Sequence, residues 1–242
     1  MKDLAWLTAQ PIAHRGYHDM NHKVWENTLS AFSRAIDAGF GIECDLQFAS
    51  NSVPVVFHDD DLERLCKLSG DVREKTSGEL GLMSIGGTAD KVPSLKQLMT
   101  LVSGKVPLVL ELKGRKGDDD GFAETVLEVL EGYKGLVALM SFDVWLLKDL
   151  KELGCPYPVG LTAEGTSPET FFAHDDAMHL GLDFISYCNA HLPNSFVTAQ
   201  RQRHVPIITW TVRDEAAARH TYAHADQITF EGFDPRTLTL TS

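Results

Sequence analysis

Short apolar runs alternate with stretches of amphipathic spacing along almost the whole chain. The apolar runs, many of them rich in β-branched residues, predict strands at residues 11–14, 41–47, 53–57, 107–113, 136–142, 159–161, 183–186, 206–211 and 227–230. Apolar residues at helical spacing predict helices at residues 28–38, 94–102, 122–133, 144–153, 168–178, 195–204 and 215–222. Strands that alternate with helices imply parallel pairing through right-handed crossovers.

About eight such units in 242 residues predict a (β/α)8 TIM barrel. The competing architecture is an open, doubly wound sheet. It is disfavoured because no Gly-rich phosphate-binding motif follows the first strand. The run at 53–57 follows the run at 41–47 after a short turn of polar and small residues, so these two predict a hairpin. We expect a single domain over residues 1–242. Within it, a charged, Gly-rich insertion with one short helix covers the site at residues 59–91, after the second strand unit.

Charge and cysteine content narrow the class of protein. The chain has 22 Lys and Arg against 34 Asp and Glu, a formal net charge of -12, which disfavours nucleic acids and anionic membranes as partners. We find no signal segment and no apolar run long enough to cross a bilayer, so we expect no stable membrane anchor. The four cysteines are far apart and form no CxxC pair. These features favour a cytoplasmic protein with free thiols, and they leave the oligomeric state undecided.

Carboxylates stand one residue apart in the second predicted strand. Glu43 and Asp45 share a face of that strand, while Cys44 points to the other layer and is expected to pack in the core. Two carboxylates forced together repel unless a proton or a cation neutralises them, and a hard divalent cation such as Mg²⁺ or Ca²⁺ prefers carboxylate oxygens. The alternative is a surface strand with two solvated acids.

A second pair, Glu111 and Lys113, closes the strand at 107–113 and again shares a face. These two residues could pair with each other. They could also supply a third metal ligand and a cation for a phosphate. A buried lysine at the end of a barrel strand could instead be a Schiff-base nucleophile, so carbonyl chemistry is a rival at this point.

Two histidines end predicted strands beside these acids. His14 and His58 in such company suggest a general base and a general acid. Arg15 offers a planar fork for phosphate oxygens, and Gly16 allows a close approach or a sharp turn of the backbone.

Taken together, these motifs resemble the glycerophosphodiester phosphodiesterase family over nearly the whole chain. The resemblance rests on His14-Arg15-Gly16, Glu26-Asn27-Thr28, Glu43-x-Asp45, His58-Asp59, Glu111-x-Lys113, Ser141-Phe142 and Trp210-Thr211-Val212. Two positions depart from the family's usual pattern. Trp25 stands where proline is usual, and the last strand ends in Thr229-Phe230-Glu231-Gly232-Phe233 where Thr-Asp-x-Pro is usual. The departures bear on substrate detail and not on the core chemistry.

The resemblance implies a TIM barrel with an insertion after the second strand unit and the hydrolysis of glycerophosphodiesters to glycerol 3-phosphate and an alcohol. It implies one divalent cation, Mg²⁺ or Ca²⁺, held by Glu43, Asp45 and Glu111 and joined in many members by Glu26 or by water. It implies His14 and His58 as the acid–base pair. It places Arg15 and Lys113 on the phosphate and Trp210 on the glycerol or leaving-group side.

The mechanism expected from these roles has two stages. One histidine removes the proton of the glycerol 2-hydroxyl, which attacks phosphorus, while the other protonates the leaving alkoxide. Water then opens the cyclic phosphate as the histidines exchange roles. Direct attack by water, and the assignment of acid and base between the two histidines, stay open.

Three rivals remain. A phospholipase D-type enzyme acting on lysophospholipids or sphingomyelin would need an apolar or basic rim, and residues 59–91 supply little of either. A non-catalytic, phosphodiester-binding barrel would be expected to lack one of the histidines or acids, and none is missing. A Schiff-base lyase built on Lys113 is the third. In every case a small molecule is the expected partner.

Overall fold

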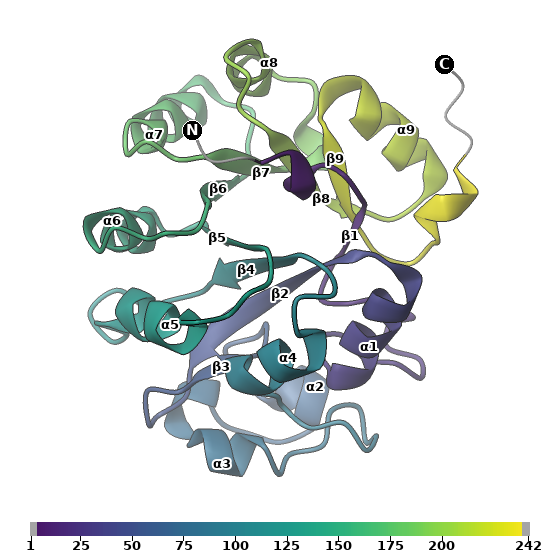
Figure 1. Cartoon of the computed structure of the whole chain (residues 1–242), viewed down its shortest axis with the longest axis vertical. Helices are drawn as coiled ribbons and strands as arrows, with labels where there is room; N and C mark the ends of the chain where they lie inside the picture. Colours follow the sequence, from purple (N-terminus) through teal and green to yellow (C-terminus); the bar gives the residue numbers. More distant parts are fainter. Residues whose placement is uncertain (1–3, 239–242) are drawn as a thin grey trace.

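The computed structural model describes residues 4–238 and confirms the TIM barrel (Figure 1). Eight parallel strands pair in the order β1-β9-β8-β7-β6-β5-β4-β2, and pairing of β1 with β2 closes the barrel. The strands are β1 (Ile12–Ala13), β2 (Gly41–Phe48), β4 (Leu108–Leu112), β5 (Val137–Ser141), β6 (Val159–Ala163), β7 (Phe184–Cys188), β8 (Ile207–Val212) and β9 (Gln227–Phe230).

Helices surround the barrel and cover its outer face (Figure 1). They are α1 (Leu29–Ala38), α4 (Leu95–Val102), α5 (Phe122–Leu130), α6 (Val144–Glu152), α7 (Pro168–Met178), α8 (Ser195–Gln202) and α9 (Glu215–His224), with short 3-10 turns η1 (Ala5–Leu7), η3 (Asn189–His191) and η4 (Pro235–Thr237). Side-chain caps begin several of them, as where Thr28 accepts from the backbone of Ala31 and starts α1. Within the described residues, no helix is long and apolar enough to cross a membrane.

Side chains alternate along each strand between two cores. Those facing outward pack under the helices. Cys44 is among them and is fully buried, as expected. Those facing inward fill the barrel, where Val109, Met140 and Ile208 meet Leu7 from η1. Glu43, Asp45 and Glu111 belong to the inward set, because they lie one residue away from outward-facing Cys44 and Leu110. The alternation therefore directs all three acids to the barrel interior.

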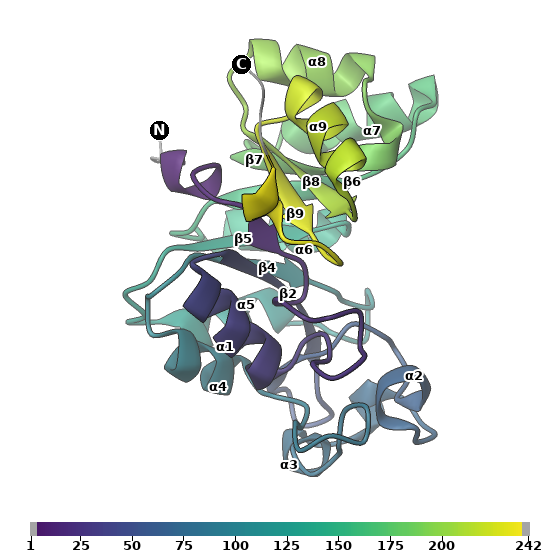
Figure 2. The same ribbon diagram turned by 90° about the vertical axis from the view of Figure 1, so that its right-hand side faces the viewer.

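The predicted hairpin is present and carries an insertion at one end of the molecule (Figures 1 and 2). Strand β3 (Pro54–Val56) pairs antiparallel with the far end of β2. The following insertion holds two short helices, α2 (Glu63–Cys66) and α3 (Ser77–Leu80), and the 3-10 turn η2 (Val72–Glu74), where the sequence predicted one helix. The insertion has a small apolar core of its own, which includes Leu65 and Leu80 together with Phe57 from the hairpin.

Two strands run two residues further than their apolar residues predicted. Strand β6 continues past Leu161 through Thr162 and Ala163, and β7 continues to Cys188. The extra residues continue the register of the pairing, with Thr162 opposite Ser186 and Ala163 opposite Tyr187. Both polar side chains are buried, so they interrupt the apolar run without ending the strand.

Candidate active site

The candidate site is a cavity of about 230 Å³ in the mouth of the barrel. It lies where the strands end at their carboxyl side, which is the active face of this fold. The cavity brings together seven of the eight site residues expected from the sequence. Its lining is His14, Arg15, Glu43, Asp45, His58, Glu111, Met140, Phe142, Ser186, Trp210 and Thr229.

Three buried carboxylates form one wall of this cavity. One oxygen from each of Glu43, Asp45 and Glu111 lies within 4.8 Å of the other two, and each residue is at most 8% exposed. Burial and the charge of Asp45 raise the pKa of Glu43 and of Glu111. Burial acts on Asp45 too, but Arg15, His58 and Lys113 outweigh it and hold its pKa below the usual range. Buried oxygen ligands that repel one another suit a hard divalent cation, so the donor set fits the ion that the sequence predicts.

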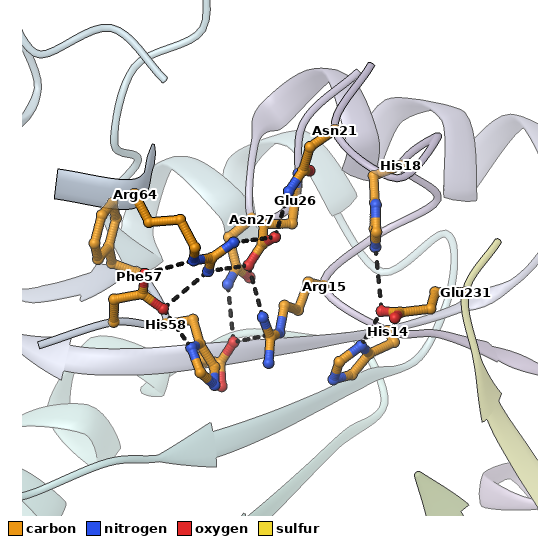
Figure 3. A network of polar contacts seen from close by, with 12 residues as sticks. His14, Arg15, His18, Asn21, Glu26, Asn27, Phe57, His58, Arg64 and Glu231 are labelled. Carbon is orange, nitrogen blue, oxygen red and sulfur yellow. Dashed lines mark hydrogen bonds and ion pairs between the residues drawn. The ribbon is translucent and has the colours of Figure 1, made fainter. Parts of the chain in front are cut away.

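Arg15 lies against the acids because the loop after β1 turns sharply. Its φ angle is 53°, and its backbone N–H donates to Glu43 Oε2 at 2.9 Å. Its guanidinium donates to Glu26 Oε1 at 2.6 Å and lies 3.4 Å from Asp45 Oδ2 (Figure 3). Gly16 allows the turn: its φ is +82°, and an added Cβ would lie 2.9 Å from that of Ala31. Burial opposes the charge of Arg15, but Asp45, Glu26 and Glu43 raise its pKa, so it stays a cation.

The hairpin brings His58 back to the level of the acids. Strand β2 runs past Asp45, the chain turns, and the returning strand places the N–H of Phe57 on the carbonyl oxygen of Asp45 at 3.0 Å. His58 follows, and its Nδ1 lies 2.7 Å from Asp59 Oδ1. Arg64 of α2 holds the same carboxylate through Nε and Nη2 (Figure 3). His58 therefore lies two residues after the antiparallel strand β3, and not at the end of one of the parallel barrel strands.

His14 lies immediately after β1 and is buried. Its Nδ1 lies 2.6 Å from Glu231 Oε2, and its Nε2 lies 3.9 Å from Glu43 Oε2 on the cavity side. Burial lowers the pKa of His14 despite the Glu231 carboxylate, so the neutral ring is favoured. A neutral imidazole whose Nδ1 proton is held by an acid presents Nε2 as a proton acceptor.

Lys113 lies just outside the cavity. Its Nζ donates to the carbonyl oxygen of His58 at 2.7 Å, and it lines a second cavity of about 220 Å³ that shares Glu111 and Phe142 with the first. Trp210 lines the first cavity, where the ring of Phe142 packs edge-on against it at 5.3 Å. Trp210 thus lines the cavity itself, whereas Lys113 adjoins the acids from the side.

The family resemblance implies that Glu26 joins the cation in many members, but here its carboxylate is bonded to other side chains. Its oxygens accept from Arg15, from Arg64 and from Asn21, at 2.6–2.8 Å. Asn27, the next residue, donates from its side chain to Asp45 Oδ2 at 2.8 Å. Glu26 therefore ties the arginines together, while its neighbour orients one of the three acids.

The sequence did not predict three residues that hold the site in place. Glu231 appeared only as a departure from the family pattern, and Arg64 and His18 were given no role. His18 is buried, with Nε2 at 3.5 Å from Glu231 Oε2. The second histidine four residues after His14 is the one feature of the sequence that could have indicated it.

A second group of possible metal ligands lies on the same rim. Atoms of Glu164, Cys188 and His191 lie within 4.8 Å of one another. However, His191 Nδ1 accepts from the N–H of Gly165 at 2.9 Å, so the neutral ring carries its proton on Nε2. Burial also raises the pKa of the Cys188 thiol. This group is less suited to a cation than the three buried acids.

A larger hollow of about 730 Å³ opens at the opposite end of the barrel. Its lining includes Arg201, His204 and Asp226, which precede strands β8 and β9. Arg201 and Asp226 pair there at 3.0 Å, and Asp226 also accepts from the backbone of Ile207. These contacts join neighbouring units of the barrel, as expected of the face that stabilises this fold.

Comparison with known proteins identifies the family of this chain. The profile of the Glycerophosphoryl diester phosphodiesterase family matches residues 14–232. YhdW of Bacillus subtilis is 27% identical over 219 residues, which cover 86% of this chain and 87% of YhdW. A glycerophosphodiester phosphodiesterase structure from Thermotoga maritima superposes with a TM-score of 0.74 at 26% identity, over 90% of this chain and 92% of the other.

A phosphodiesterase of Oleispira antarctica, solved with its product sn-glycerol-3-phosphate, superposes with a TM-score of 0.83 at 22% identity. The match covers 95% of this chain and 96% of that one, and at this identity it supports the fold. The match over residues 14–232 includes every site residue named above. The chain therefore belongs to the glycerophosphoryl diester phosphodiesterase family, a family of phosphodiester hydrolases.

Proposed function

We propose that this chain hydrolyses glycerophosphodiesters to glycerol 3-phosphate and an alcohol, with one divalent cation and with His14 and His58 as the proton-transfer pair. One observation carries the proposal: a single cavity holds both imidazoles, one partly buried arginine and three buried carboxylates. Membership of the family supports the reaction class. The product bound to the Oleispira antarctica enzyme is consistent with a glycerol phosphate as the product.

Glu43, Asp45 and Glu111 would hold the cation, Mg²⁺ or Ca²⁺. Their oxygens are buried and close together, and burial together with the negative charge of Asp45 raises the pKa of Glu43 and of Glu111. When bound, such an ion neutralises these acids and offsets charge on the phosphate oxygens.

Two imidazoles then serve two proton transfers. Each has its Nδ1 on a carboxylate, His14 on Glu231 and His58 on Asp59, so each directs Nε2 elsewhere. In the reaction we propose, one Nε2 accepts the proton of the glycerol 2-hydroxyl as that oxygen attacks phosphorus. The other Nε2 delivers a proton to the departing alkoxide. Water then opens the cyclic phosphate with the roles reversed.

The remaining site residues would bind the substrate. The Arg15 guanidinium, which stays charged beside the acids, would hold a phosphate oxygen. Lys113 would add a second positive charge from the side, and Trp210 with Phe142 would form an apolar wall for the organic part of the substrate.

The test uses purified protein with glycerophosphocholine and glycerophosphoethanolamine, and it quantifies released glycerol 3-phosphate. We expect turnover with Mg²⁺ or Ca²⁺, loss of turnover after EDTA treatment, and recovery when the ion is returned. Asp45→Asn should not recover at the same ion concentration. Full activity after exhaustive chelation would exclude the role of the cation. If neither substrate releases glycerol 3-phosphate with either ion, the proposed reaction is excluded. Lysophosphatidylcholine is assayed in parallel, and turnover of that substrate alone would identify a lipid-directed enzyme.

A matched substrate tests the cyclic stage. The analogue that lacks the 2-hydroxyl keeps the same phosphate and leaving group but cannot form the ring. We expect its rate to fall by at least about 10³-fold, since the nucleophile held next to phosphorus is gone. An unchanged rate would mean direct attack by water.

A further inference from the structure

We propose that Glu231 is a positioning residue for the reaction above: it fixes the orientation and the tautomer of His14, so that Nε2 faces the cavity. This inference rests on the proposed function for its kinetic consequence.

Strand register brings the two residues together across 217 positions of sequence. Strands β1 and β9 pair in parallel with Ala13 opposite Phe230, so His14 and Glu231 are the next pair at the rim. The N–H of His14 also donates to the carbonyl oxygen of Phe230 at 2.9 Å. Thr229 lines the cavity, and Glu231, two residues further on, is directed toward the same side and is only 7% exposed.

Both carboxylate oxygens of Glu231 are held. Oε2 lies 2.6 Å from His14 Nδ1, and Oε1 accepts from Arg213 Nε at 2.7 Å. A carboxylate fixed in this way accepts a hydrogen bond from the Nδ1–H of His14. The ring then carries its free lone pair on Nε2. The same relation of acid to imidazole orients the histidine of hydrolytic triads.

His18 adds to the same arrangement (Figure 3). Its Nδ1 accepts from the N–H of Met20 at 3.1 Å, so the neutral ring carries its proton on Nε2, which lies 3.5 Å from Glu231 Oε2. The carboxylate thus lies among His14, His18 and Arg213. On the other side of the cavity, Asp59 stands in the same relation to His58. Each catalytic imidazole has its own acid, and Glu231 supplies the one for His14.

A double-mutant cycle separates positioning from a merely structural role. Glu231→Gln should lower kcat for glycerophosphocholine by about 10–10²-fold and change KM by less than about threefold. His14→Asn should lower kcat by about 10²–10⁴-fold. The double variant should be no slower than His14→Asn alone, because residues that act as a unit are not additive. Asp234→Asn, which alters a carboxylate in the same terminal segment, is the control and should keep wild-type kinetics.

Two results would overturn the proposal: losses that multiply in the double variant, or an effect of Glu231→Gln confined to KM. Nitrogen-15 NMR of the imidazoles, recorded with Mg²⁺ present, reads the tautomer without turnover. We expect His14 to carry its proton on Nδ1 in the wild type and to move toward the Nε2–H form in Glu231→Leu. A wild-type His14 protonated on Nε2 would refute the pairing. If no glycerophosphodiester is turned over, the proposed function fails while the NMR result still decides the pairing.

Discussion

At the level of single residues, each reactive group in the cavity has a partner that decides where its proton or its charge lies. His14 pairs with Glu231, His58 pairs with Asp59, and Arg15 is surrounded by acids. Glu231 comes from the opposite end of the sequence, whereas Asp59 is the next residue along the chain, and each is itself held by an arginine, Arg213 or Arg64. The geometry of the imidazoles is therefore set before a substrate enters, which is the condition for efficient proton transfer.

The two imidazoles should be distinguishable by the leaving group. Replacing either histidine with asparagine should lower kcat for glycerophosphocholine by about 10²–10⁴-fold. The variant that lacks the general acid should recover on the p-nitrophenyl ester of glycerol phosphate, because nitrophenolate leaves without a proton. The variant that lacks the general base should stay slow on both esters. Steady-state kcat on the two substrates makes the assignment, and recovery by neither variant would contradict a general acid among them.

Much of the residue-level chemistry follows from short spacings in the sequence. Glu43-x-Asp45 predicts two side chains on one face, and the structure places both in the cavity, with Cys44 in the outer core. The pairing of His14 with Glu231 could not be predicted in this way. It depends on the register of the first and last strands, which only closure of the barrel determines.

At the level of elements, the hairpin of β2 and β3 and the insertion after it explain how His58 reaches the site. The insertion is tied to the barrel through Arg64 of α2. This residue bonds Asp59 beyond the hairpin and both oxygens of Glu26 in the loop after β1. A single side chain thus joins three segments around one imidazole, and its loss should loosen the insertion.

Replacing Arg64 should destabilise the protein in a pH-dependent way. Burial opposes ionisation of Glu26, but hydrogen bonds from Arg64 and the charge of Arg15 lower its pKa from 4.5 to about 2. A depressed pKa stabilises the folded state above the unfolded pKa, and this contribution is lost as pH falls from about 4.5 toward 2. The side chain of Arg64 is 44% exposed, so solvent screens part of the effect. We expect Arg64→Gln to cost about 1–2 kcal/mol at pH 7 and less at pH 3.

Chemical denaturation of both proteins at pH 7, 4 and 3 measures this difference. Arg219→Gln is the matched control, since the Arg219 side chain is 43% exposed and lies 3.7 Å from Glu215 on the same exposed helix surface. Such a surface pair contributes at most about 1 kcal/mol. Equal losses in the two variants, or a loss from Arg64→Gln that does not vary with pH, would contradict the linkage.

The elements themselves were largely predictable, and their ends were less so. The sequence predicts α7 at residues 168–178, as observed, because Ser167 caps it and Pro168 suits its first turn. Helix α5 ends at Leu130, three residues earlier than predicted, because Glu131 leaves the helical conformation. The number of short helices in the insertion was also missed, since segments of four residues carry too little periodicity to identify.

At the level of the whole molecule, closure of the barrel brings acidic side chains together in the interior of a chain that is acidic overall. The net charge is -12, and three of the acids that contribute to it, Glu43, Asp45 and Glu111, lie in one buried space. Arg15 lies within contact distance of only part of this group. The folded state without an ion therefore either keeps unfavourable repulsion or holds Glu43 and Glu111 protonated, as their raised pKa values indicate. Strands β2 and β4, which carry the three acids, cannot separate to relieve the repulsion because they pair directly with each other in the barrel.

A bound divalent cation should therefore stabilise the whole barrel. An ion that binds the folded state alone, at 100 times its Kd, adds about 2.7 kcal/mol to the free energy of unfolding. For a chain of this size, this corresponds to a rise in Tm of about 5–10 °C.

Glu111→Gln removes a ligand and part of the repulsion. We expect it to match or exceed the wild-type Tm in EDTA and to show little rise with Mg²⁺ or Ca²⁺. Glu215→Gln, on the exposed side of α9, should respond to the ion as the wild type does. Thermal melts of the three proteins with and without the ion measure these Tm values. If the ion raised the Tm of Glu111→Gln as much as that of the wild type, the stabilising ion would bind outside the three acids.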